Sequence, residues 1–215
     1  MAELNVFVSV GSTSNDAQEA FVRAVEDRLR SEGLIPHTVG RNTFSSDSPF
    51  KAITELMNRC SGVVVIALER LHVAQGSEKR GGPNESALSD VKMSTAWNQI
   101  EAAMAYCRGV PLLVLVEEGL RADGLLEKGF DWYVQTIKVD PTSLHTQVFT
   151  GVLASWKEKL SARAKRSTEM TPNVGELTVA QLLGALKPAQ LWSALAALAG
   201  VVAAAFALGA RLIGG

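Results

Sequence analysis

The sequence predicts a doubly wound α/β domain, in which helices cover both faces of a parallel sheet, followed by one C-terminal membrane helix. Strand-like and helix-like segments alternate along most of the chain, which is typical of such a sheet. The run Gly62–Leu68 is apolar almost throughout, as expected for a strand covered on both faces. The stretch Leu191–Ala210 has no charged residue, which indicates a membrane span.

The predicted strands are short apolar or β-branched segments. They are Asn5–Val10, Leu34–Val39, Gly62–Leu68, Pro111–Val116 and Trp132–Val139. The predicted helices are amphipathic segments with polar or glycine-containing ends. They are Asp16–Arg30, Pro49–Arg59, Ser94–Cys107 and Leu144–Lys165. This order favours a flavodoxin-like five-stranded parallel sheet, in which ligands bind beyond the carboxyl ends of the strands.

Two connections are long and polar. The loop Gly40–Pro49 follows the second predicted strand, and the stretch His72–Asp90 contains three glycines and a proline. The second stretch is too long for an ordinary connection. We expect it to be either a mobile lid over a site or a surface insertion.

The alternating pattern ends near Lys165, which predicts three parts. Residues 1–165 are the expected folded domain, and residues 166–189 are the expected linker and juxtamembrane segment. Residues 190–213 are the expected transmembrane helix, because 20 helical residues rise about 30 Å, the thickness of a hydrocarbon core. The other interpretation of this last segment is a helix that docks on the domain.

Small residues recur in the predicted membrane helix. Ala196, Gly200 and Ala204 are four residues apart, a spacing that lets two helices approach closely. We therefore expect self-association through this helix.

Composition excludes several classes of protein. The formal net charge is -1, so nothing in the balance calls for nucleic acid. Cys60 and Cys107 match neither a disulfide framework nor zinc or redox spacing, and both are expected as buried thiols in a reducing compartment. The N-terminus lacks the features of a secretory signal. We expect a cytoplasmic domain anchored in the inner (cell) membrane.

The candidate site lies on the helix expected at Ser94–Cys107. At about 100° per residue, Ser94, Trp97 and Glu101 share one edge of this helix, beside an apolar stripe that includes Ile100 and Met104. A single carboxylate can stabilise the cationic sugar that forms when an N-glycosidic bond breaks. Phosphate-loop, dinucleotide, zinc-protease and nucleophile-elbow motifs are absent from the sequence, so neither metal nor cofactor is expected.

The same residues carry a resemblance to a known family. Ser94-x-x-Trp97-x-x-x-Glu101, followed by Arg108-Gly109 and the strand Pro111-Leu-Leu-Val-Leu, resembles the third-helix motif of TIR domains, particularly those that hydrolyse NAD. Val6-Phe-Val-Ser9 is similar to their first strand, and the resemblance covers about residues 4–165. It implies that Glu101 is the catalytic residue and that NAD is a substrate.

The resemblance also implies a binding pocket and a mode of regulation. Trp97 and Ser94 would contribute to the pocket, and the loops after the first and second strands would form its walls. The pocket residues expected in these loops are Ser9, Gly11, Ser12, Arg41 and Phe44. Regulation would depend on self-association of the domain. The segment His37–Gly40 lacks the acidic residue of many TIR domains at that position.

A second resemblance points to the same class of bond. Glu69-Arg70, the polar stretch that follows, and the segment Glu101–Pro111 resemble nucleoside 2-deoxyribosyltransferases. Three functions therefore remain open. They are a membrane-anchored NAD glycohydrolase of antiviral defence or signalling, a non-enzymatic sensor or adaptor of a nucleotide signal with a membrane-perturbing helix, and a deoxyribosyltransferase-like N-glycosidase.

Overall fold

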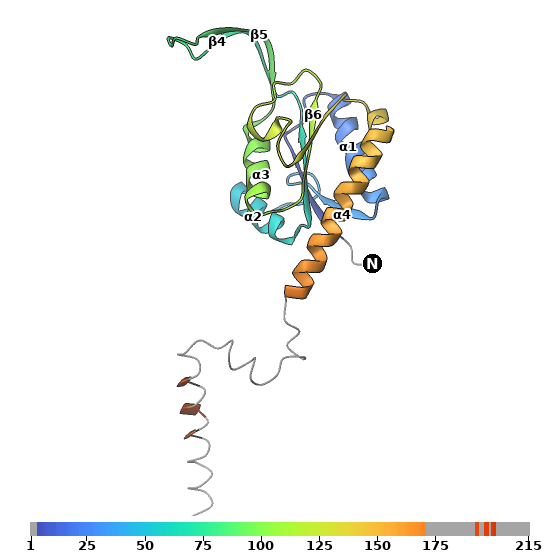
Figure 1. Cartoon of the computed structure of the whole chain (residues 1–215), viewed down its shortest axis with the longest axis vertical. Helices are drawn as coiled ribbons and strands as arrows, with labels where there is room; N and C mark the ends of the chain where they lie inside the picture. Colours follow the sequence, from blue (N-terminus) through green and yellow to red (C-terminus); the bar gives the residue numbers. More distant parts are fainter. Residues whose placement is uncertain (1–3, 171–191, 194–195, 198, 201–215) are drawn as a thin grey trace, which may run out of the picture. The chain divides into compact units, whose positions relative to one another are not determined.

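The computed structural model describes residues 4–170, 192–193, 196–197 and 199–200 (Figure 1). Its centre is a parallel sheet with the strand order β2-β1-β3-β6-β7. The strands are β1 (Leu4–Val10), β2 (Leu34–His37), β3 (Gly62–Ala67), β6 (Leu112–Glu117) and β7 (Tyr133–Ile137). The predicted five-stranded, flavodoxin-like parallel sheet is confirmed, because the chain places its second strand on one side of the first and the others on the opposite side.

The α-helices in the described part of the chain cover both faces of the sheet (Figure 1). They are α1 (Asp16–Ser31), α2 (Pro49–Arg59), α3 (Ala96–Cys107) and α4 (Gln147–Met170). Two 3-10 turns, η1 (Gly124–Leu126) and η2 (Pro141–His145), lie in the connections. The helix α4 continues past Lys165 to Met170.

The apolar side chains form one core on each face of the sheet. Residues of α1 and α4 pack with Val6 and Val8 on one face, whereas residues of α2 and α3 pack with Phe7 on the other. Successive side chains of a strand point to opposite faces, which explains this division. Ser9, two residues after Phe7, therefore faces α2 and α3.

The segment expected to be an irregular polar stretch is a β-hairpin. The strands β4 (Leu71–Glu78) and β5 (Ser86–Met93) pair antiparallel and extend away from the sheet in Figure 1. Ion pairs of Glu69 with Lys92 (2.9 Å) and of Arg121 with Glu78 (2.7 Å) attach it to the domain. The sequence did not predict the hairpin because both strands are largely exposed, so apolar and polar residues alternate only over the short segments Leu71–Val73 and Val91–Met93.

No helix among the described residues is long and apolar enough to cross a membrane. The predicted span at residues 190–213 lies outside the described residues, apart from 192–193, 196–197 and 199–200.

A glycine in β3 allows α4 to pack closely on the sheet. An added Cβ at Gly62 would collide with Leu160 Cδ2 and would lie 2.8 Å from Trp156 Cζ2. We expect Gly62→Ala to lower the free energy of unfolding by about 1–3 kcal/mol, through overpacking. An added Cβ at Gly151 in α4 would have no neighbouring atom within 4 Å. There the same substitution should raise the free energy of unfolding by up to about 1 kcal/mol. Urea denaturation of both variants measures the contrast, and equal effects would contradict this account of the packing.

Candidate functional site

The face of α3 that packs on the sheet is polar at its N-terminal half. Asn98 and Glu101 are 1% and 7% exposed, and Ala102 and Ala105, which follow on the same face, are fully buried. Residues three or four apart lie on one side of a helix. The alanines let the helix axis lie close to the sheet, so the polar pair is covered as well.

The apolar stripe lies largely on the outer side of α3. Trp97 and Ile100 are 42% and 39% exposed, Cys107 is also exposed, and Met104 is partly buried. Trp97 and Glu101 lie one turn apart on α3 as predicted, but Trp97 is exposed whereas Glu101 is buried. Of the two thiols expected to be buried, only Cys60 is buried. Hydropathy alone favours the large apolar side chains for burial. The short distance between α3 and the sheet leaves room only for the small ones.

The polar pair lies where the carboxyl ends of two neighbouring strands meet. Asn98 Nδ2 donates hydrogen bonds to Ser9 Oγ on β1 (3.1 Å) and to the carbonyl of Ile66 on β3 (3.4 Å). The strand order reverses between β1 and β3, since β2 lies beside β1 on the other side. Open α/β sheets bind ligands at this switch point. Asn98 and Glu101 therefore occupy the position in the fold that is most suited to a ligand site.

Burial controls the acidity of the Glu101 carboxyl. It raises the pKa of Glu101 from 4.5 to about 7, while a hydrogen bond with Ser9 acts in the opposite direction. Burial disfavours the charged form, and a donor to the carboxylate favours it. At neutral pH the carboxyl is thus poised between its ionised and protonated forms, as groups that transfer protons or stabilise charge often are.

Of the predicted loop residues, Gly11 lies close to the start of α3. Thr95 caps the helix by accepting the Trp97 N–H at 3.4 Å, and Ser94 precedes the helix instead of lying on it. An added Cβ at Gly11 would lie 3.1 Å from Thr95 Cγ2, so the loop after β1 packs against this cap. Ser12, the next residue of that loop, is exposed.

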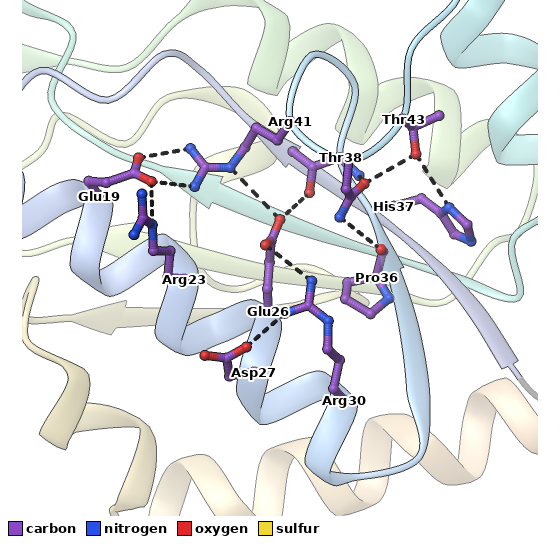
Figure 2. A network of polar contacts seen from close by, with 11 residues as sticks. Glu19, Arg23, Glu26, Asp27, Arg30, Pro36, His37, Thr38, Arg41 and Thr43 are labelled. Atoms are coloured by element: carbon purple, nitrogen blue, oxygen red, sulfur yellow. Dashed lines mark hydrogen bonds and ion pairs between the residues drawn. The ribbon is translucent and has the colours of Figure 1, made fainter.

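Arg41 belongs to a different cluster (Figure 2). Its guanidinium donates two hydrogen bonds to the Glu19 carboxylate on α1, at 2.9 and 2.8 Å, and its Nε lies 3.8 Å from Glu26. The hydrogen bonds of Glu19, first of all with Arg41, lower its pKa to about 2. The charge of Arg41 therefore fixes the loop after β2 to α1, and the structure does not direct it to Glu101.

Phe44 is also placed apart from Glu101. Its ring is 78% exposed and borders a hollow of about 100 Å³ against α2. A larger hollow of about 390 Å³ lies at the carboxyl ends of β6 and β7, lined by Glu117, Lys128 and Thr136 among others. Glu101 lines neither of these two hollows, and only 7% of the residue is exposed in this conformation.

Sequence reasoning missed Asn98. Its position three residues before Glu101 already placed both side chains on one side of the helix. The signal in the sequence was Ala102 and Ala105, each four residues after one of these two side chains. Small residues at this spacing mark the face of a helix that packs closely on a sheet. Among the described residues, no group of three or more His, Cys, Asp or Glu side chains could hold a metal ion.

Comparisons with known proteins give distant structural similarities. No protein-family model and no curated protein sequence matches the chain. A CMP N-glycosidase of Clostridium botulinum, BcmB, is 15% identical over 53% of this chain and 72% of its own, with a TM-score of 0.34. The TIR domains of the activated Roq1 resistosome are 14% identical over 80% of this chain and 92% of their own, with a TM-score of 0.35.

A third similarity is to the sugar isomerase domain of an RpiR transcription factor from Sphaerobacter thermophilus. It is 11% identical over 79% of this chain and 80% of its own, with a TM-score of 0.38. At these values the fold assignment rests on the chain's own strand order, and we base no function on the similarities.

The covered carboxyl of Glu101 predicts a dependence of stability on pH. The folded protein binds a proton at Glu101 up to pH of about 7, whereas the unfolded chain loses it near 4.5, so stability falls as pH rises through this window. Glu101→Gln should therefore raise the free energy of unfolding at pH 8 by on the order of 3 kcal/mol, with little gain at pH 4. Urea denaturation at both pH values measures it.

A matched control is Glu55→Gln on α2, whose side chain is 55% exposed. This variant should show no such difference between pH 4 and pH 8. A Glu101→Gln variant that is no more stable than wild type at pH 8 would contradict the buried, charged carboxylate.

Proposed function

We propose that the chain is a membrane-anchored N-glycosidase that hydrolyses the nicotinamide–ribose bond of NAD, with Glu101 as the catalytic residue. The observation that carries this proposal is the position of Glu101: a covered carboxyl with a pKa near neutrality at the switch point of the sheet. The motif Ser94-x-x-Trp97-x-x-x-Glu101 and its resemblance to NAD-hydrolysing TIR domains supply the substrate.

The main catalytic group that this reaction needs from the protein is one carboxylate. The C1′–N bond of the ribose breaks, and its electron pair goes to the nitrogen of the pyridinium ring, which leaves as neutral nicotinamide. The ionised Glu101 carboxylate would stabilise the positive charge on the sugar. Water then adds to C1′ and releases a proton. Since the leaving group needs no proton, the ionised form of Glu101 is the active one.

Access to Glu101 requires a change of conformation. Its side chain is covered by the elements around it, and the N-terminal cap of α3 is packed against the loop at Gly11. We assign the opening to self-association of the domain, with Trp97, Ser94 and the loop residues Ser9, Gly11 and Ser12 lining the opened pocket. Arg41 and Phe44 would reach substrate only after the loop after β2 rearranges, because Arg41 is bound to Glu19.

The acidity of Glu101 also favours a second candidate, a nucleoside N-glycosidase. The base of a nucleoside leaves more readily when it is protonated, so an acid catalyst helps its departure. A carboxyl with a pKa of about 7 holds a proton over much of the neutral range. The two candidates need opposite protonation states of the same residue, and this makes them distinguishable by pH.

The dependence of turnover on pH is therefore the decisive test. With the protein clustered on beads, NAD cleavage should rise with pH through about 7, whereas cleavage of deoxynucleosides or CMP should fall as pH rises through the same range. Glu101→Gln should lower either activity by about 100-fold or more, and Glu55→Gln should leave it unchanged. Nicotinamide and free base are measured by chromatography.

Each outcome of this assay has a separate meaning. If the protein cleaved nucleosides but not NAD, the second candidate, a nucleoside N-glycosidase, would replace the NAD glycohydrolase. No turnover of any of these substrates by clustered wild-type protein would contradict an enzyme. It would leave the non-enzymatic sensor, whose output is the membrane helix, as the remaining hypothesis.

The membrane anchor is a separate part of the proposal. We expect the full chain to float with phospholipid vesicles in a density gradient, and a chain ending at residue 189 to stay with the soluble fraction, because a span of about 20 uncharged residues would be lost. A Glu101→Gln chain of full length is the control and should float like wild type. Equal behaviour of the long and short chains would contradict the anchor.

A further inference from the structure

Asn98 is the one buried carboxamide on the described face of α3 that packs on the sheet. Only 1% of the residue is exposed, and its Nδ2 group donates to Ser9 Oγ at 3.1 Å and to the Ile66 carbonyl at 3.4 Å. Its Oδ1 atom is buried and has no hydrogen-bond partner within the part of the chain that the structure describes. If this side chain served only for packing, an apolar residue would make the fold more stable, because an unpaired buried oxygen lowers the free energy of unfolding.

The contact with Ser9 restricts how the serine hydroxyl can act. A hydroxyl has one hydrogen to donate and lone pairs to accept with. The lone pair of Ser9 that faces α3 is occupied by the N–H of Asn98. Glu101 follows Asn98 by one turn on the same buried face of α3. The hydroxyl hydrogen of Ser9 is then free to point at the Glu101 carboxyl, and Ser9 lowers the pKa of that group. The three side chains thus form a directed relay from Asn98 through Ser9 to Glu101.

We propose that Asn98 is a positioning residue of the site, which acts on Glu101 through Ser9 by fixing the Ser9 hydroxyl as a donor to the carboxylate. This proposal rests on the function proposed for Glu101. The amide is anchored at both strands of the switch point, so the direction of the Ser9 hydroxyl is set by the fold. Loss of Asn98 would free the hydroxyl to rotate, and the carboxylate would keep its donor for only part of the time.

Charged groups are scarce on the strands and the turn that pack against α3. The helix α2, which shares the core with α3, carries Lys51, Glu55 and Arg59, but none of the three is among the groups that shift the pKa of Glu101. The strands β1 and β3 and the turn η1 carry no charged residue, and β6 carries only Glu117. The Glu117 carboxylate accepts the Glu69 N–H at 2.7 Å. Asp123, which precedes η1, is paired with Arg121 at 2.8 Å. Within α3 itself the other titratable groups, Tyr106 and Cys107, lie at its far end. Ser9 is therefore the group that tunes Glu101.

The test is the pKa of Glu101 in the protein without substrate. It is measured by titrating the ¹³C signal of the glutamate carboxyl groups in the full chain, with Glu101→Gln identifying the signal. Ser9→Ala should raise the pKa of Glu101 by about one pH unit, the effect of one lost hydrogen bond, and Asn98→Ala by about half of that. In the double variant Asn98→Ala should add nothing, because its route through Ser9 is gone.

Two further variants keep the test decisive. Asn98→Leu keeps the branching at Cγ without the amide and replaces Asn98→Ala if the smaller side chain unfolds the domain. Gln18→Ala removes another buried carboxamide, at the start of α1, whose amide donates to the Glu69 carbonyl at 3.1 Å. This control should leave the pKa of Glu101 unchanged. A pKa that stays at the wild-type value without Asn98, or that shifts equally with and without Ser9, would overturn the proposal.

The same variants separate this inference from the proposed function. If the chain cleaves NAD, the acidic limb of its pH profile should move to higher pH in Asn98→Ala by the same amount as the pKa. If the chain cleaves neither NAD nor nucleosides, the proposed function fails, yet the titration still decides whether Asn98 acts on Glu101 through Ser9.

Discussion

The distance between α3 and the sheet is the constraint on which the candidate site depends. Ala102 and Ala105 are fully buried, and their short side chains allow the helix to lie close to the strands. At this distance Asn98 can reach both Ser9 and the Ile66 carbonyl, and Glu101 is covered. With large apolar residues at the two alanine positions, the helix would lie further out. The polar pair would then be ordinary solvated side chains.

Two carboxyl groups on opposite faces of the sheet show how the surroundings determine acidity. Glu19 lies among Arg41, Arg23 and Thr13, and its pKa falls to about 2, so it is a permanent anion that holds a loop (Figure 2). Burial raises the pKa of Glu101 to about 7, and only a hydrogen bond with Ser9 acts in the opposite direction. Chemically identical groups therefore reach very different acidities in one domain.

The candidate site is locally unfavourable, and the rest of the domain compensates for it. A carboxyl that must be buried, and an amide oxygen without a partner, both reduce the free energy of unfolding. Two apolar cores, one on each face of the sheet, supply the stabilisation. Proteins often break local rules of packing at functional sites in this way. The carboxyl ends of the strands are the part of the sheet where such a site disturbs the core least.

The sequence by itself determined the architecture, because alternating strand and helix signals and the apolar run at Gly62–Leu68 depend on local periodicity alone. It also identified Glu101 as a candidate, through its motif. Only the tertiary structure decided which face of α3 is buried, because close packing selects the small Ala102 and Ala105, whereas hydropathy favours Trp97 and Ile100. The pairing of β4 with β5, the attachment of Arg41 to Glu19 and the contact of Asn98 with Ser9 join residues distant in sequence. Their partners are therefore set by the folded chain.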